Sequence, residues 1–157
     1  MSTKKTNALR ILDHAGIPYR LVEYQYDAEN LSVEKIAAEN QIPLEKIFKT
    51  LVLQGDQGGV VVAVTPGDKT LDLKALARLS GDKKIALVDT KALQSLTGYI
   101  RGGCSPVGMK KPFPVFVDES ALLHDKILVN AGARGLLMEL QPVALEAICG
   151  ARFAAIV

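Results

Sequence analysis

The chain has 157 residues, of which 48% are hydrophobic and 23% charged, the composition of a folded globular protein of about one domain. A formal net charge of +2 at pH 7 excludes a strongly basic protein that binds nucleic acid non-specifically, so contacts with an anionic partner have to be local. The length predicts a single domain over 1–157. Two cysteines give no disulfide framework, which favours a cytoplasmic location, and the sequence has no run of 18 apolar residues, so we expect no membrane contact.

In chain order, the first half predicts a helix, a strand, a helix and a β-hairpin. Apolar residues recur at helical spacing over 4–15, and aromatic and β-branched residues follow over 18–24. Ser32 is a suitable N-cap for a short helix that ends near residue 40. The apolar runs 47–53 and 60–65 flank a glycine-rich connection, which is typical of a hairpin.

The second half predicts shorter elements around one long irregular segment. Helical spacing and capping residues indicate three helices, and short apolar runs indicate four strands. The helices are expected between Asp72 and Gly81, between Asp89 or Thr90 and Gly98, and between Pro142 and Gly150, and the strands over 84–88, 115–117, 127–129 and 136–140. The segment 99–114 holds three glycines and three prolines, and loops of this length inside a domain are usually functional or disordered.

The order of these elements favours an α+β fold. The strands are too many and too closely spaced for a regular repeat of strand, helix and parallel strand. We therefore expect one domain with a mixed, mostly antiparallel, barrel-like sheet that is surrounded by helices.

Lys49 is a charged residue inside an apolar run. The run 47–53 is apolar on both alternating faces, so this side chain is either partly desolvated or extends from the rim of a sheet into solvent. Burial disfavours an ammonium ion, which suits a lysine for an acid–base or electrostatic role. From the residues alone, a functional lysine and a solvated rim lysine both remain open.

The sequence Gly-Gly-Cys-Ser-Pro-Val-Gly at 102–108 is a second candidate for chemistry. Closely spaced glycines allow backbone N–H groups to turn towards a ligand, as an oxyanion hole or an anion nest requires. A turn-rich loop without a ligand would have the same glycine content. Four basic residues near this loop and a later glycine turn could bind phosphates or simply be solvated: Arg101, Lys110, Lys111 and Arg134.

Other apparent motifs lack the spacing that their chemistry needs. Asp68 separates Gly67 from Lys69, so the phosphate-binding loop of nucleotide-binding proteins is not formed. The two histidines, His14 and His124, have no local catalytic signature beside them, and with the two scattered cysteines they match no zinc-ligand pattern. We expect no metal and no cofactor.

Several ordered motifs together resemble one family, the YbaK/EbsC-type Cys-tRNA(Pro) deacylases, within the superfamily of editing domains associated with prolyl-tRNA synthetase. The resemblance runs from about Leu9 to Phe153. Its motifs are Ile-Phe-Lys-Thr-Leu at 47–51, Val-Thr-Pro at 64–66, Leu-Asp-Leu-Lys at 71–74, Thr-Gly-Tyr at 97–99 and the glycine-rich segment 102–111.

The resemblance implies an enzyme that removes an amino acid wrongly esterified to tRNA, with the aminoacyl-tRNA acceptor end, and in some cases prolyl-tRNA synthetase, as partners. Lys49 matches the essential lysine of the family, which would position or stabilise charge while the substrate's own thiol attacks its ester. Arg101, Lys110, Lys111 and Arg134 are candidates for tRNA contacts. The residues expected at the substrate are Tyr24, Thr50, Gly102, Gly103, Cys104, Ser105, Pro106 and Gly108.

One position departs from the family pattern. Leu137 stands in the sequence Gly-Leu-Leu-Met-Glu-Leu at 135–140 where the family carries an acidic residue at the pocket. The amino-acid preference therefore stays open, and so do two alternatives: a deacylase for alanine or serine that activates water, and a non-catalytic module that binds tRNA or a synthetase.

Overall fold

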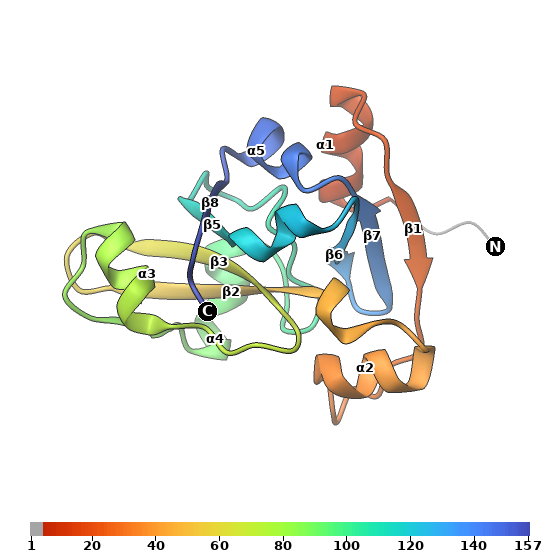
Figure 1. Cartoon of the computed structure of the whole chain (residues 1–157), viewed down its shortest axis with the longest axis horizontal. Helices are drawn as coiled ribbons and strands as arrows, with labels where there is room; N and C mark the ends of the chain where they lie inside the picture. The colour runs from red at the N-terminus through yellow and green to blue at the C-terminus, as the bar shows by residue number, and fades with distance from the viewer. Residues whose placement is uncertain (1–4) are drawn as a thin grey trace.

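The structure is a computed structural model that describes residues 5–157, and its strands form two sheets with helices around them (Figure 1). The described residues form five α-helices, two short 3-10 helices (η) and eight strands. In chain order these are α1 (Asn7–Ala15), β1 (Arg20–Glu23), α2 (Val33–Asn40), η1 (Leu44–Lys46), β2 (Phe48–Gly55), β3 (Val60–Pro66), α3 (Leu73–Ser80), β4 (Ile85–Leu87), α4 (Thr90–Thr97), β5 (Val115–Asp118), η2 (Glu119–Leu123), β6 (Ile127–Ala133), β7 (Leu136–Leu140), α5 (Val143–Cys149) and β8 (Arg152–Ala154).

Local signals in the sequence explain where the helices begin and end. Thr6 and Ser32 accept hydrogen bonds from backbone N–H groups in the first turns of α1 and α2, and Asp89, rather than Thr90, caps α4. Four of the helices end at a glycine in the left-handed conformation: Gly16, Gly81, Gly98 and Gly150. The predicted start of the first helix at residue 4 lies outside the described residues.

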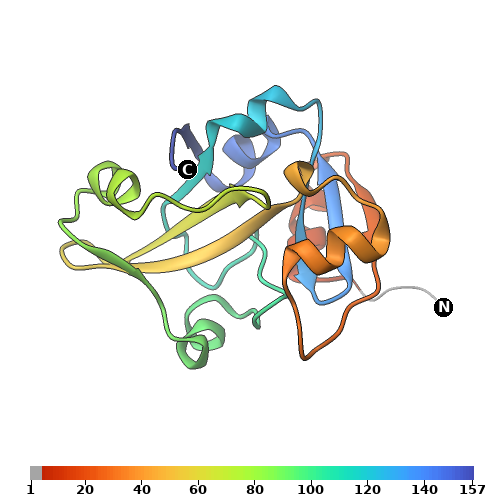
Figure 2. The same cartoon turned by 60° about the horizontal axis from the view of Figure 1, so that its bottom comes forward.

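The strands form two sheets. An antiparallel sheet has the order β1-β7-β6, and a mixed sheet has the order β4-β2-β3-β5-β8, in which β3-β5 and β5-β8 are parallel. The sheets meet where Ile47, just before β2, forms a parallel bridge with Leu128 of β6. Figures 1 and 2 show the β2–β3 hairpin extending away from this junction, while α2 lies beside the antiparallel sheet.

The predicted α+β class is confirmed, but the barrel-like closure is not. Within residues 5–157 the strands form two separate sheets, which are joined by a single bridge between Ile47 and Leu128. The strand β8 was not predicted, since three residues that pair only with the distant β5 carry little local signal. Among the described residues, no helix is long and apolar enough to cross a membrane, and no cluster of His, Cys, Asp and Glu could hold a metal ion.

Candidate functional site

A cavity of about 350 Å³ lies at the junction of the two sheets. Its walls come from the start of β2, from the long loop after α4, from β6 and β7, and from α2, which covers one side. Five residues expected at the site from the sequence line it together: Tyr24, Lys49, Thr50, Gly102 and Cys104. Arg101, which was expected to contact tRNA, lines it as well.

Lys49 and Thr50 bring polar groups to the side of the cavity that β2 forms, where their neighbours Phe48 and Leu51 are apolar. The Lys49 side chain is half-buried and takes part in none of the ion pairs found among residues 5–157. The Oγ1 atom of Thr50 is buried and has no hydrogen-bond partner in the part of the chain that the structure describes. A buried hydroxyl without a partner is costly and uncommon in folded proteins, so both side chains keep binding capacity that the protein itself does not use.

The loop that carries Gly102 is held by the turn between β6 and β7. The Nδ2 atom of Asn130 donates to the Gly102 carbonyl at 2.9 Å, and the Nε atom of Arg134 donates to the Arg101 carbonyl at 2.9 Å. A Cβ atom on Gly103 would lie 3.0 Å from the backbone nitrogen of Arg134, so only glycine allows the two segments to approach this closely. The loop is therefore a fixed wall of the cavity.

The remaining residues of the glycine-rich loop support the wall from behind and do not line the cavity. Ser105 and Pro106 are buried, and the Ser105 hydroxyl accepts the N–H of Val107 at 3.2 Å. Gly108 has a φ of +82°, and a Cβ atom there would lie 2.8 Å from the hydroxyl of Tyr99. These residues, together with Gly103, shape the loop that presents Gly102.

Two ionisable groups in the cavity are kept neutral at physiological pH. Burial raises the pKa of the Cys104 thiol to about 11, so the reactive thiolate form is scarce. Burial also raises the pKa of the Tyr24 hydroxyl, although Gly135 and Asn130 oppose that shift. Tyr24 can therefore serve as a hydrogen-bonding group, and Cys104 is a poor nucleophile.

The cavity contains two polar residues that the sequence analysis did not single out. Glu34, in the first turn of α2, is the only carboxylate among the residues that line it, and Asn130 is the anchor of the glycine loop. Leu137 is buried in the cavity wall beside Tyr24, so this wall is apolar where the family pattern has an acid. Glu34 reaches the cavity because α2 packs there from a distant part of the chain, so no local sequence pattern indicates that this residue belongs to the site.

The expected tRNA contacts are spread more widely. Lys110 and Lys111 are exposed and lie outside the cavity wall, whereas Arg134 is half-buried and engaged with the backbone of Arg101. Among these four residues, Arg101 alone borders the cavity. Lys110 and Lys111 therefore remain candidates for contacts with the tRNA outside the pocket.

Comparison with known proteins decides the family. The sequence profile of the aminoacyl-tRNA editing domain matches residues 28–148. A protein of Enterococcus faecalis, described as a candidate Cys-tRNA(Pro)/Cys-tRNA(Cys) deacylase, EbsC, is 46% identical over 153 residues, which cover 98% of this chain and 93% of the relative. The chain belongs to the aminoacyl-tRNA editing domain family.

Two further comparisons show that this editing domain is similar to proteins associated with prolyl-tRNA synthesis. The proline–tRNA ligase of Thermosipho africanus is 30% identical over 92 residues, which cover 59% of this chain and 16% of the ligase. A crystal structure described as that of a candidate trans-editing enzyme for prolyl-tRNA synthetase superposes with a TM-score of 0.82 at 26% identity, covering 98% of this chain and 97% of the other. The resemblance inferred from the sequence motifs is thereby confirmed.

Proposed function

We propose that this editing domain acts in trans and removes cysteine from mischarged Cys-tRNA(Pro). The family establishes the reaction class, since its members edit aminoacyl-tRNA. The name of EbsC favours a cysteinyl ester, and the description of the superposed trans-editing enzyme favours action in trans beside prolyl-tRNA synthetase. A deacylase of this kind works in the cytoplasm on released aminoacyl-tRNA, and prolyl-tRNA synthetase is the partner that supplies its substrate.

One observation carries the mechanism: the cavity lacks an activated protein nucleophile. Burial raises the pKa of Cys104 to about 11, and the described residues that line the cavity include no histidine to serve as a base for it. In cysteinyl-tRNA the substrate thiol is held close to its own ester carbonyl, which gives an intramolecular attack the advantage of proximity. In this proposal the reacting nucleophile is the substrate's own sulfur, because the protein supplies none.

In this reaction the substrate sulfur bonds to the ester carbonyl carbon and the bond from that carbon to the ribose oxygen breaks. The thiol proton passes to the departing ribose oxygen, so the products are a cysteine thiolactone and free tRNA. The ammonium of Lys49 stabilises the negative charge that develops during the step, and the free hydroxyl of Thr50 hydrogen-bonds to the substrate. The backbone at Gly102 lies against the aminoacyl carbonyl and the terminal ribose.

Glu34 binds the α-ammonium group of the substrate in this proposal. It is the only carboxylate among the described residues that line the cavity, and Leu137 supplies none. An aminoacyl ester carries an amine that is partly protonated at neutral pH, and a carboxylate is its natural ion-pair partner. Glu34→Gln should therefore raise KM for Cys-tRNA(Pro) more than it lowers kcat.

Single-turnover deacylation of Cys-, Ser- and Ala-tRNA(Pro) tests the substrate and the mechanism together. Cysteine and serine differ by about one atom, and pocket shape discriminates such near-isosteres by only ~10–200-fold. A much larger preference for the cysteine ester, with a trapped thiolactone product, is expected. Equal rates on the cysteine and serine esters would refute attack by the substrate thiol and favour an activated water, and no turnover of any ester would identify a binding module.

A further inference from the structure

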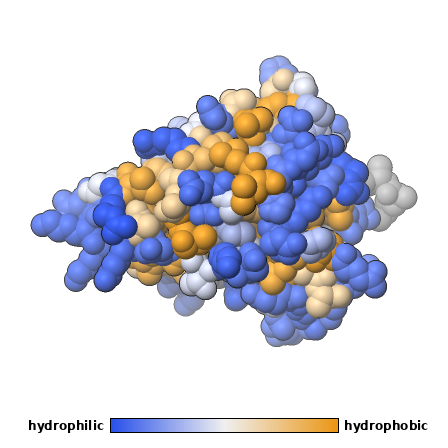
Figure 3. Space-filling model, in the orientation of Figure 1, coloured by the Kyte–Doolittle hydropathy of each residue, from blue (hydrophilic) through white to orange (hydrophobic). Residues whose placement is uncertain are grey.

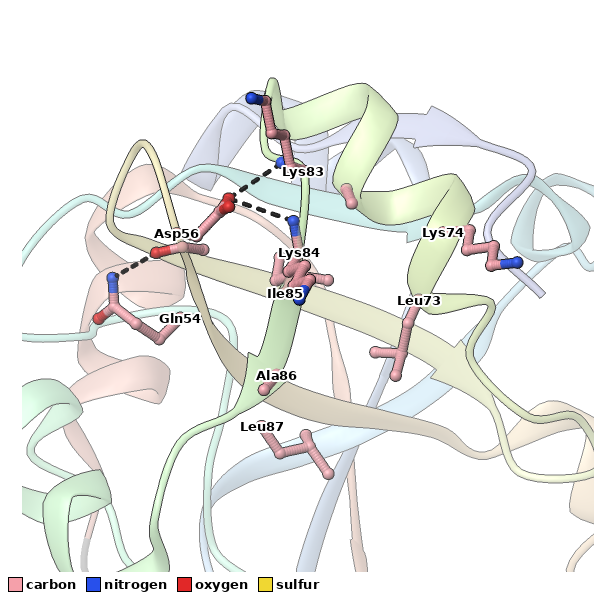
Figure 4. Close-up of a pocket in the computed structure, with 11 residues that line it drawn as sticks. Gln54, Asp56, Leu73, Lys74, Lys83, Lys84, Ile85, Ala86 and Leu87 are labelled. Atoms are coloured by element: carbon pink, nitrogen blue, oxygen red, sulfur yellow. Dashed lines mark hydrogen bonds between the residues drawn. The ribbon is translucent and has the colours of Figure 1, made fainter.

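A second cavity, larger than the first, lies at the far end of the mixed sheet. It has a volume of about 740 Å³ and is formed between α3, β4 and the end of β2 (Figure 4). Its apolar surface comes from Leu73 and Ala77 of α3 and from Ile85 and Leu87 of β4. None of the residues that line it belongs to the editing site. We call this cavity the β4 groove.

Large apolar side chains of the β4 groove are open to solvent. Leu87 is 61% exposed and Leu73 is 46% exposed, whereas Ile85, on the same strand as Leu87, is buried. Figure 3 shows hydrophilic residues around the end of the molecule where α3 and the β2–β3 turn lie, with apolar residues reaching the surface beside them. Exposed leucines on both sides of a cavity gain free energy when another apolar surface covers them.

One edge of β4 is available for backbone pairing. The strand stands at the end of the sheet order, and β2 is its only strand neighbour within residues 5–157. The carbonyl of Lys84 accepts from Asp56 and the N–H of Val88 donates to Val52, so these alternate residues face β2. Ile85 and Leu87 therefore direct their backbone N–H and C=O groups to the open edge.

The charge around the β4 groove is positive. Lys74, Lys83 and Lys84 line it, all are exposed, and none takes part in the ion pairs found in the described chain. Asp56 is the one carboxylate among the described residues that line the groove, and it already accepts the backbone N–H groups of Lys83 at 2.9 Å and Lys84 at 3.2 Å, as Figure 4 shows.

We infer that the β4 groove binds an extended acidic segment of another protein, which adds a strand to the open edge of β4. The backbone of that segment pairs with Ile85 and Leu87, its apolar side chains cover Leu73 and Leu87, and its carboxylates face the three lysines. The lysines also disfavour pairing with a neutral or basic strand. A second copy of this chain fits less well, because it would bring two sets of three lysines together.

The test is a titration of the ¹⁵N-labelled protein with a capped peptide of alternating valine and glutamate, about eight residues long, followed by NMR. The largest amide shifts are expected at Ile85 and Leu87, with a Kd of about 1 mM or tighter. A peptide of alternating valine and lysine should bind at least tenfold more weakly. N-methylation of alternate peptide residues should abolish binding, because it removes the backbone donors.

Charge reversal gives the matched variant. The double variant Lys83→Glu with Lys84→Glu should no longer bind the acidic peptide and should bind the basic peptide instead. The same double change at Lys110 and Lys111, two consecutive exposed lysines outside the groove, should alter the binding of neither peptide. Both variants can be checked for folding by the unchanged shifts of their core amides. The Lys83/Lys84 variant should deacylate at the wild-type rate, which separates this inference from the proposed function.

Four outcomes would overturn the inference. The first is that the amides of Ile85 and Leu87 do not shift even at the highest peptide concentration. The second is that the N-methylated peptide binds as tightly as the unmodified one. The third is that a short RNA duplex shifts the same amides and binds more tightly than the acidic peptide, which would indicate a nucleic-acid surface. The fourth is dimerisation without peptide in sedimentation velocity, with the same amides shifting as the protein concentration rises.

Discussion

Asn130 holds Gly102 in place across 28 residues of sequence, through a hydrogen bond of 2.9 Å from its Nδ2 atom to the glycine carbonyl. The same amide group donates to the carbonyl of Ala133, and its Oδ1 atom accepts from Gly132 and Ala133. One side chain thus fixes both the turn between β6 and β7 and the loop that borders the cavity.

Asn130→Asp should damage the editing site while keeping the shape of the side chain. The aspartate cannot donate to the carbonyls of Gly102 and Ala133, which should cost about 1–3 kcal/mol of unfolding free energy. Displacement of Gly102 should lower kcat/KM for deacylation by ~10-fold or more. Asn40→Asp, which makes the same change at the end of α2, should lose similar stability and little activity. Equal kcat/KM losses in the two variants would contradict a positioning role.

Lys49→Ala should abolish most of the deacylation and leave the fold intact. The side chain is half-buried at the cavity and has no ion-pair partner among the described residues, so its removal breaks little structure. Loss of one group that stabilises developing charge lowers a rate by about 100–1,000-fold. Single-turnover rates and circular dichroism check this, with the exposed Lys91→Ala as control. Wild-type turnover by a folded Lys49→Ala protein would remove Lys49 from the mechanism.

Cys104→Ser should retain most of the activity. Burial raises the pKa of the Cys104 thiol to about 11, so at neutral pH the group is a neutral part of the wall. The native protein should also react slowly with iodoacetamide, and reaction should accelerate on unfolding. A loss of activity of about three orders of magnitude in the serine variant would instead establish a cysteine nucleophile.

The stability of the protein should fall in acid partly through Glu139. Hydrogen bonds and ion pairs with Arg20 and Lys46 lower the pKa of this buried carboxyl to about 2. Because the folded-state pKa is depressed, the contribution is complete above the unfolded value near 4.5 and disappears as the pH falls towards 2. Since Arg20 is largely exposed and screened, we expect about 1–2 kcal/mol at neutral pH.

Urea unfolding of wild type and Glu139→Gln at several pH values measures this contribution. The difference between the two proteins should be constant from neutral pH to about pH 5 and should shrink below it. A difference that is still complete at pH 3 would show that the ion pairs are not its source.

Replacing Lys110 and Lys111 by alanine should weaken tRNA binding to a similar extent for different tRNA sequences. Both side chains are exposed outside the cavity, which suits contacts with phosphates. The slope of log Kd against log salt concentration should become shallower by about one to two charges. An unchanged slope would exclude both lysines from the interface.

Local signals in the sequence predicted most of the fold. Capping by Ser32 and termination at Gly16 or Gly98 depend on a few neighbouring residues, and the structure has each of them. The strand β8 and the separation of the sheets depend on contacts between distant segments, such as Phe116 with Arg152 and Ile47 with Leu128. No short pattern encodes those contacts.

For the candidate site, too, the sequence indicated the residues that stand out locally and missed those that only the fold brings together. Lys49 is conspicuous as a charge within an apolar run, and the glycine loop by its composition, and both border one cavity. Glu34 and Asn130 are ordinary polar residues on a helix and a strand, and only folding brings them to that cavity. The sequence suggests that Gly103 binds a ligand. In the structure its lack of a Cβ atom instead allows the loop to lie close to the backbone of Arg134.

The strand β2 reaches both cavities, with Lys49 near its first residue and Gly55 at its last. Six residues of extended chain separate the two positions by roughly 20 Å. A protein strand seated on β4 would therefore leave the mouth of the editing cavity uncovered. The enzyme would then stay bound to the partner protein that supplies this strand while charged tRNAs enter and leave the editing cavity. Its local concentration near that partner would rise, and the deacylation step itself would be unchanged.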